Sequence, residues 1–385
     1  MAVTTARRQV LAFRLRRQHL ARRLGAPSLA DVTATCSVRN SPPGSAQVAL
    51  LARVNGVSEG RVSTALSERR LVEVHGPRMV PALIRPRDLA VFTVGGIGTD
   101  DESLRESFGK LTASRLAEAG ISPTDALTRV VEAAYAELAG GVRGKGELSA
   151  AMTARLPESM SLWCERCGSR HVSEELFRLP GAAGIYCIAP RSGREVCYVR
   201  VDEWLDTEIP AVGSAAARDA GRELLRRFLR CYAPATPGDF ADWTRIGVAD
   251  ARQRFTGLAD DLQEVSWDGQ KGWVLRDDID ELRDARPPSG VRLLPPSDPY
   301  LLARDRVTLI PDPSKRKLVW PSLGAPGTLV VDGEIVASWR SQKTGTVLRV
   351  QIGYFDRPTT KAASLIEQEA QLLAGLRGCR TAEVS

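Results

Sequence analysis

Two cysteines and a histidine in the middle of the sequence have the side-chain types that bind zinc. Cys164 and Cys167 are separated by two residues, and His171 follows four residues later. Thiolate sulfur and imidazole nitrogen are usual zinc ligands, and Cys187 or Cys197 is available as a fourth. A zinc signature usually contains two well-spaced pairs, however. Small side chains at a boundary between a strand and a helix are therefore an equally open interpretation.

Other catalytic patterns find little support in the sequence. The run Gly95-Gly-Ile-Gly98 is not followed by Lys-Ser or Lys-Thr, as a phosphate-binding loop would be. The chain has three histidines, which offers few candidates for a triad or a multi-histidine metal site. Kinase chemistry and triad hydrolysis are therefore not expected.

The start of the chain concentrates positive charge. Seven arginines precede the first acidic residue, Asp31, and this segment accounts for the whole formal net charge of +7. Apolar residues from Val10 to Leu24 recur at helical spacing, which predicts an amphipathic helix with an arginine face. We expect Arg14, Arg16 and Arg17 on that face to contact the phosphates of DNA. The alternative is a solvated helix with no ligand, since charge runs often serve solubility alone.

Helical patterns that end in short strand pairs predict winged-helix units. In the first block, four helices precede two strands, one of which ends close to His75. That histidine is predicted to contact a phosphate or the sugar, or else to be merely exposed. The helices are expected at residues 5–24, 28–38, 43–53 and 58–68, and the strands at 71–74 and 79–84.

Two further blocks repeat this order. Ser122-Pro starts a helix that runs to Leu138, Gly140-Gly141 breaks it, and another helix covers 147–155. In the third block, helices over 221–232, 236–246 and 248–255 precede strands at 262–267 and 273–275, which form a wing around a turn at 268–272. Helix, glycine turn and helix is the helix-turn-helix outline, although short helices joined by glycine also occur in plain helical bundles.

The character of the sequence changes after Pro287-Pro288. Short strands are predicted at 317–320, 328–331, 334–340 and 346–354, followed by a helix over 360–376. Asp332-Gly333 is a strong hairpin signal, and residues 342–345 form a second turn with a basic tip. Arg340 and Lys343 near this tip are predicted to press into a groove of DNA. The alternative is an ordinary exposed polar turn.

Composition agrees with a protein of several domains. The chain has 385 residues, of which 43% are hydrophobic, and it has no apolar run approaching the ~20 residues needed to span a bilayer. Its seven cysteines are scattered and odd in number, so we expect mostly reduced thiols and a cytoplasmic location.

A set of short motifs in one order resembles the winged-helix proteins that include the AlkZ-like and YcaQ-like DNA glycosylases. The resemblance spans nearly the whole chain. Its motifs lie at 42–46, 49–53, 88–93, 163–168 with His171, 176–178, 293–301, 305–306, 326–327, 331–333 and 339–340.

The resemblance implies an α+β fold, in which three tandem interleaved winged-helix motifs are followed by a small antiparallel β-barrel-like domain. The corresponding segments are 1–98, 99–200, 201–288 and 289–385. It also implies hydrolysis of the N-glycosidic bond of bulky N7-alkylguanines in duplex DNA, as self-protection against an alkylating natural product. We expect a monomer associated with the nucleoid that needs neither a cofactor nor a metal for this reaction.

The catalytic position departs from the family pattern. In these glycosylases a Gln-x-Gln or Gln-x-Asp motif precedes the segment equivalent to 42–46, and counting back from Ala46 places Arg39 and Ser41 there, with Asn40 between them. Arginine cannot act as a base near neutral pH. Asn40 or Ser41 is predicted to position the water and Arg39 to hold a flanking phosphate, although Asn40 and Ser41 would also suit a helix cap. The alternative function is a non-catalytic winged-helix DNA binder, either a regulator or a lesion shield.

Overall fold

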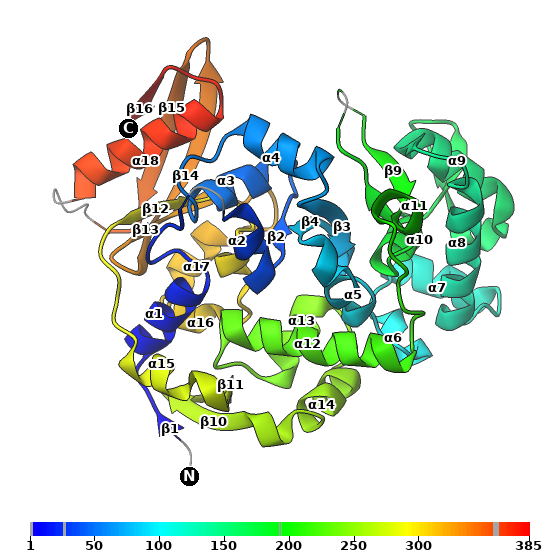
Figure 1. The fold of residues 1–385 in the computed structure, drawn as a ribbon, viewed down its shortest axis with the longest axis horizontal. Coiled ribbons are helices and arrows are strands. Elements are labelled where there is room, and N and C mark those ends of the chain that lie inside the picture. The colour runs from blue at the N-terminus through cyan, green and yellow to red at the C-terminus, as the bar shows by residue number, and fades with distance from the viewer. Residues whose placement is uncertain (1–2, 26–27, 192, 194, 357–361) are drawn as a thin grey trace. The chain divides into compact units, whose positions relative to one another are not determined.

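Helices and strands mix along the chain, which confirms the predicted α+β class (Figure 1). The computed structural model describes residues 3–25, 28–191, 193, 195–356 and 362–385. These residues form two compact units, each assembled from several segments. Unit 1 comprises residues 1–64, 226–239 and 260–385, and unit 2 comprises residues 65–225 and 240–259. No helix in the described ranges combines the length and apolar character needed to cross a membrane.

Unit 1 begins with short helices and ends with a sheet. Its N-terminal elements are β1 (Val3–Thr4), α1 (Arg7–Arg17), α2 (Leu29–Thr35), β2 (Val38–Arg39) and α3 (Ser45–Leu51). Its later elements are β10 (Leu262–Trp267), β11 (Gln270–Leu275), α15 (Ile279–Asp284), β12 (Val291–Leu294), α16 (Arg306–Leu309), α17 (Pro313–Val319), β13 (Gly327–Val331), β14 (Glu334–Thr344), β15 (Val347–Tyr354), α18 (Ala363–Leu376) and β16 (Thr381–Val384).

Unit 2 combines a helical core with a sheet. Its elements are β3 (Val72–Gly76), β4 (Val80–Ile84), α5 (Leu89–Phe92), α6 (Asp101–Arg105), α7 (Lys110–Glu118), α8 (Pro123–Glu137), β5 (Arg143–Gly144), α9 (Lys145–Arg155), β6 (Ser161–Cys164), β7 (Ser169–Val172), α10 (Glu174–Ala182), β8 (Tyr186–Ile188), β9 (Cys197–Arg200), α11 (Val201–Leu205) and α14 (Val248–Thr256). Three helices contain residues of both units: α4 (Glu59–Ser67), α12 (Ala215–Tyr232) and α13 (Pro237–Thr244).

Local sequence signals explain most of these boundaries. Ser122 caps α8 by accepting a hydrogen bond from the backbone N–H of Asp125, and Pro123 occupies the first helical position. Between β10 and β11, Asp268 and Gly269 both have positive φ, as a two-residue hairpin turn requires. The predicted strand pair is therefore present as a hairpin, with a shorter turn and a longer second strand than expected.

The C-terminal sheet corrects part of the prediction. Its order is β12-β13-β14-β15-β16, and the first three pairings are antiparallel, but β16 runs parallel to β15. The strand expected at 317–320 is wrong, because Asp312 and Pro313 start helix α17 there. The turn expected at 342–345 is also shifted, since β14 continues to Thr344 and the chain reverses at Gly345 and Thr346. The first residues of the helix expected from 360 lie outside the described residues.

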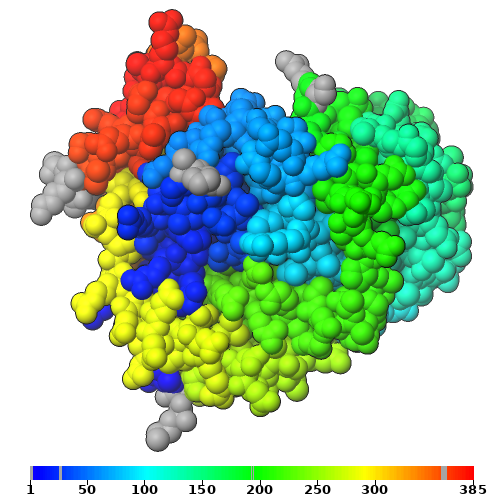
Figure 2. All heavy atoms as spheres, in the orientation of Figure 1, coloured from blue at the N-terminus to red at the C-terminus, as the bar shows by residue number. Residues whose placement is uncertain are grey.

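Helix α18 packs against this sheet and completes its core (Figure 1). Its buried face includes Ile366, Ala370 and Leu373, and the sheet contributes Leu329 and Val350. In the space-filling view the α18 atoms (red) and the hairpin atoms (orange) form one continuous surface (Figure 2). The packing of α18 against the sheet thus fixes the hairpin of β14 and β15, and with it the basic residues on these strands.

Candidate functional site

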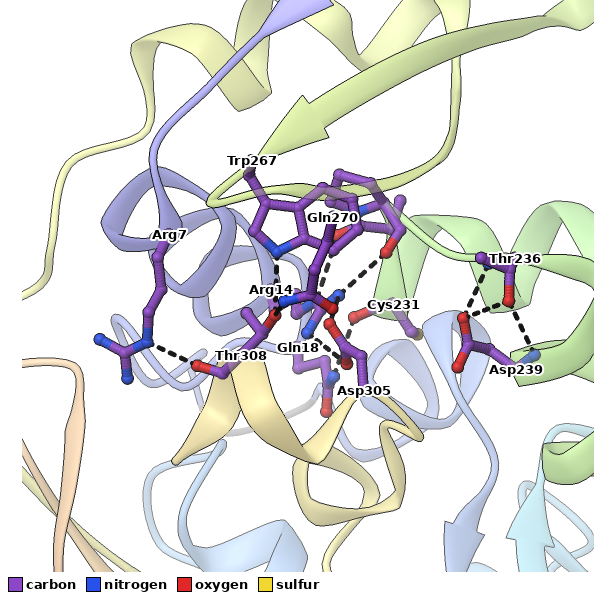
Figure 3. Close-up of polar contacts among 12 residues, drawn as sticks. Arg7, Arg14, Gln18, Cys231, Thr236, Asp239, Trp267, Gln270, Asp305 and Thr308 are labelled. Carbon is purple, nitrogen blue, oxygen red and sulfur yellow. Dashed lines mark hydrogen bonds and ion pairs between the residues drawn. The ribbon is translucent and has the colours of Figure 1, made fainter. Parts of the chain in front are cut away.

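Arg14 is a core residue of unit 1. Its side chain is 0% exposed, and its guanidinium makes two 2.9 Å hydrogen bonds with the carboxylate of Asp305 (Figure 3). It also donates to the backbone carbonyls of Ala233 at 3.1 Å and Pro234 at 3.0 Å. All three nitrogens of the Arg14 guanidinium thus donate hydrogen bonds inside the unit. The prediction that Arg14 contacts DNA is therefore wrong: its charge compensates a carboxylate from a distant segment.

Three of the other six N-terminal arginines have acidic partners as well. Arg17, which was also predicted to contact DNA, is half-buried and forms ion pairs with Asp278 and Glu281. Arg23 pairs with Glu369 at 2.7 Å and Arg7 pairs with Glu334 at 2.7 Å. Much of the local positive charge that the sequence shows is thus neutralised by acidic residues that come much later in the chain.

Arg16 and Arg22 remain exposed and border a basic hollow. This hollow has a volume of about 660 Å³ and is also lined by Arg23 and Arg286. Four guanidinium groups around one concave surface favour an anionic ligand such as a DNA backbone. Of the three arginines predicted to contact phosphates, Arg16 is the one whose surroundings in unit 1 fit that role.

The turn from Arg39 to Gly44 leads into α3. Asn40 is buried at 6% exposure, and its Oδ1 accepts hydrogen bonds from the backbone N–H groups of Gly44 at 2.9 Å and Ala46 at 3.4 Å. Asn40 therefore binds backbone N–H groups at the start of the helix, although the N-cap position itself is Gly44, so the capping alternative is met only in part. Arg39 and Ser41 are half-buried. Gly44 has a φ of +90°, a conformation that glycine adopts without strain.

A groove of about 490 Å³ opens beside this turn. Gly44 lines it just before α3, Gln47 lines it from α3, and Glu59 lines it from the start of α4. The opposite wall consists of the hairpin and the end of α18, with Ser341, Lys343, Leu348, Leu376 and Arg377. Segments from both ends of the chain thus meet around one opening within unit 1.

Gln47 and Glu59 are the polar groups of the groove that sequence reasoning missed. The Oε1 atom of Gln47 is buried and has no hydrogen-bond partner among the residues that the structure describes. A buried unpaired carbonyl oxygen is costly, and an acceptor in a groove can be satisfied by a water or a substrate. Glu59 is exposed and supplies a carboxylate to the same opening. Neither residue lies in a sequence motif with recognisable spacing. Their shared place in one groove can therefore be seen only in the folded structure.

Arg340 and Lys343 lie on β14, as the hairpin prediction required, and both are exposed. Arg340 donates to the carbonyl oxygen of Gly324 at 2.5 Å, and Lys343 donates to that of Arg377 at 3.0 Å. Backbone carbonyls orient these side chains but carry no net charge. The hairpin wall of the groove therefore carries the positive charge of Lys343, and Arg340 lies on the same strand.

His75 is a buried residue of unit 2, with 2% exposure. It packs on Tyr186 and Tyr198, with ring centroids 5.7 Å and 6.0 Å away, and a Cβ at Gly181 would be 2.4 Å from its Nδ1. Burial lowers the pKa of His75 to about 3, and the charges of Arg178 and Lys145 add to this effect. The predicted contact of His75 with DNA is therefore wrong, as is the alternative of simple exposure.

Cys164, Cys167 and His171 come together at the tip of the β6–β7 hairpin in unit 2. Their ligand atoms all lie within 4.8 Å of one another. Cys187 and Cys197, considered as a fourth ligand, lie on β8 and β9 and are not part of this group within the described residues. The cluster has the composition of a metal site with three protein ligands.

Comparison with known proteins agrees with this architecture. Residues 32–376 match the model of the family described as DNA glycosylase AlkZ-like. The chain is 25% identical over 344 residues to the "Interstrand DNA cross-link repair glycosylase" of Streptomyces sahachiroi, covering 86% of this chain and 87% of that protein. Its fold is similar to the solved structure of Streptomyces sahachiroi DNA glycosylase AlkZ, with a TM-score of 0.79, 22% identity and full coverage of both chains.

The family match extends over most of the sequence and includes both compact units. The chain belongs to the AlkZ-like DNA glycosylase family. DNA glycosylases hydrolyse N-glycosyl bonds, so the protein is an enzyme of this class, as the sequence resemblance implied.

Proposed function

We propose that this glycosylase excises bulky N7-alkylguanine from duplex DNA and protects its host from a DNA-alkylating natural product. The relative from Streptomyces sahachiroi is named for interstrand cross-link repair, and this chain is similar to it over most of its length. The single observation that carries the proposal is the groove of unit 1, which Gln47 and Glu59 line together with Lys343 of the basic hairpin. The enzyme acts as a monomer, in the cytoplasm and on the nucleoid.

The proposal includes three winged-helix motifs. In chain order, α2, α3 and α4 precede the hairpin of β3 and β4, and α12, α13 and α14 precede the hairpin of β10 and β11. Between them, α8 and α9 precede β8 and β9. Winged-helix motifs share this order of helices followed by a two-stranded wing. The order supports duplex DNA as the ligand.

The chemistry required of the protein is modest. An N7-alkylated guanine carries a positive charge, which weakens its bond to the sugar and lets the base leave as a neutral molecule without a general acid. A water oxygen bonds to the sugar C1′ while the C1′–N9 bond breaks, and the electron pair of that bond neutralises the base. The water then loses a proton to an acceptor. Positioning this water and stabilising the cationic sugar are the remaining tasks.

Residues of the groove fit these tasks. The Oε1 of Gln47 accepts a hydrogen bond from the attacking water, and the Glu59 carboxylate stabilises the sugar cation and accepts the proton. Asn40 holds the turn, Ser41 supplies a second hydrogen bond to the water, and Arg39 binds the flanking phosphate. A carboxylate in this position replaces the acidic or amide groups that the family motif carries upstream.

The basic groups around the groove position the DNA. Arg340 and Lys343 on the hairpin, with Arg16 in the basic hollow, bind phosphates of the duplex. A bulky adduct does not fit a tight nucleobase pocket, and a groove of about 490 Å³ open to solvent can hold it beside the helix. No metal or cofactor takes part in this reaction.

The non-catalytic alternative is tested by incubating the protein with a duplex that carries one N7-alkylguanine and then treating the DNA with alkali. The glycosylase leaves abasic sites, which alkali converts to strand breaks at the position of the adduct. A DNA binder that shields the lesion would shift the duplex in a gel but leave the strand intact. Mass spectrometry should also detect the free alkylated base, in an amount equal to that of the abasic sites.

A further inference from the structure

The hairpin of β6 and β7 brings three potential metal ligands onto one side. Strand register pairs Leu162 with His171 and Cys164 with Ser169. Residues two apart on a strand share a face, and directly paired residues do as well. Cys164 and His171 therefore point to the same face of the hairpin, where the turn also places Cys167. The ligand atoms of all three residues lie within 4.8 Å of one another.

The turn itself is built for a close approach of the two thiols. The backbone N–H groups of Cys167 and Gly168 both donate to the carbonyl oxygen of Cys164, at 3.2 Å and 2.9 Å. Gly168 has a φ of +60°, which lets the chain curl back into β7 without a Cβ clash. The sequence Cys-x-x-Cys-Gly thus folds into a tight loop whose two sulfurs lie on its inner side.

The distances suit zinc. With Zn–S bonds of about 2.3 Å and tetrahedral angles, two sulfur ligands of one zinc ion lie about 3.8 Å apart. Ligand atoms within 4.8 Å need to shift by less than a bond length to reach this spacing. Ser169 Oγ lies 3.3 Å from His171 Nε2, so a hydroxyl is at hand to orient the imidazole, as groups around metal-bound histidines do.

The hairpin is anchored near its base. Val172 is buried, and its backbone N–H donates to Thr153 Oγ1 at 2.8 Å, whereas residues 165–168 at the tip are exposed. Two strands of four residues each are marginally stable on their own. A metal ion at the tip would close the hairpin where apolar packing contributes little.

We propose that Cys164, Cys167 and His171 bind one zinc ion, with a water molecule as the fourth ligand, and that this ion holds the tip of the β6–β7 hairpin. The site belongs to unit 2, whereas the groove belongs to unit 1, and the role of the site is structural. It is independent of the glycosylase proposal, since no step of that reaction uses it.

Metal analysis of the full-length protein, purified without a histidine tag or chelator, tests this site directly. We expect close to one zinc per chain by inductively coupled plasma mass spectrometry. Replacement of zinc by cobalt should give a thiolate-to-cobalt charge-transfer band in the near ultraviolet. His171→Ala, which keeps both thiols, should weaken cobalt binding by at least about tenfold.

Cys197→Ser is the matched control, because Cys197 is a half-buried free thiol on β9 outside the cluster. It should retain the zinc content and the cobalt spectrum of the parent. A folded parent protein that contains no zinc and gives no charge-transfer band with cobalt would overturn the proposal. So would a disulfide between Cys164 and Cys167 in protein purified under reducing conditions. Both outcomes are measured on the parent protein, so they do not depend on whether a variant folds.

Discussion

Helix α1 and the β14–β15 hairpin are both basic, but the structure uses their charges in opposite ways. On α1, Arg14 and Arg17 are bound to carboxylates, and Arg14 has no exposed surface. On the hairpin, Arg340 and Lys343 are exposed and bonded to backbone carbonyls. A carboxylate cancels a charge, whereas a carbonyl only orients it. The hairpin thus keeps the positive charge of these two residues, whereas most of the arginines on the helix are paired with carboxylates inside unit 1.

The difference shows why arginine spacing alone misleads. Arg14 and Arg16 are two residues apart on the same helix, but only Arg16 borders the basic hollow. A stripe of arginines marks a DNA-binding face only where acidic partners are absent, and those partners come from segments hundreds of residues later. Variants of the two regions should therefore separate stability from DNA affinity.

Arg14→Leu should have the largest effect on stability. It leaves the Asp305 carboxylate half-buried without its partner, and it removes the donors to the carbonyls of Ala233 and Pro234. Breaking a buried ion pair in this way costs about 3–5 kcal/mol. Chemical denaturation followed by circular dichroism measures the loss.

Arg349→Ala is the matched control for that variant. Arg349 pairs with Glu383 at 3.1 Å, and both side chains are about 60% exposed. An exposed pair contributes at most about 1 kcal/mol to stability. The free energy of unfolding of the variant should therefore be close to that of the parent. Equal losses for Arg14→Leu and Arg349→Ala would mean that burial does not distinguish the two regions.

The double variant Arg340→Ala with Lys343→Ala should lower DNA affinity without lowering stability. Each lost phosphate contact should reduce the slope of log affinity against log salt by about 0.9. Fluorescence anisotropy with an undamaged duplex at several salt concentrations measures this slope. A slope equal to that of the parent would exclude the hairpin as a phosphate-binding surface.

Arg16→Ala sharpens the comparison within α1. Arg16 is exposed at the hollow, so its loss should also reduce the salt slope, by about 0.9 for one phosphate contact, with little change in unfolding free energy. The same anisotropy titration applies. Should the slope stay constant while stability falls, Arg16 would belong with Arg14 among the structural arginines.

His75 gives unit 2 a dependence on pH. The folded-state pKa is about 3 and the ordinary value is 6.5, so the unfolded chain takes up the proton first as pH falls. Stability is fully present above about pH 6.5 and declines toward pH 3 by roughly 1.4 kcal/mol per pH unit. His75→Gln should flatten this decline in unfolding experiments across that range. An unchanged pH profile would show that other groups dominate acid sensitivity.

Local signals predicted much of the fold. Ser122-Pro, Gly247 and Asp268-Gly269 set the boundaries of α8, α14 and the β10–β11 hairpin at or near the expected positions. Asp312-Pro313 was a comparable helix start, but the apolar residues after it were interpreted as a strand.

The candidate site was harder to predict because it depends on long-range contacts. Asn40 could be anticipated as a cap from its place before a helix, since that role is local. Gln47 and Glu59 gave no such signal, because their groove exists only when α3, the hairpin and α18 come together. The burial of Arg14 and His75 likewise depends on partners that are distant in sequence.

The rate of base release by Gln47→Ala under single-turnover conditions, with the protein in excess over a duplex carrying one N7-alkylguanine, tests the central claim most directly. We expect the rate to fall by about a hundredfold, with Glu59→Gln giving a similar loss, while affinity for the same duplex stays within about twofold of the parent. A Gln47→Ala rate equal to that of the parent would contradict the assignment of the groove as the place where the glycosidic bond is broken.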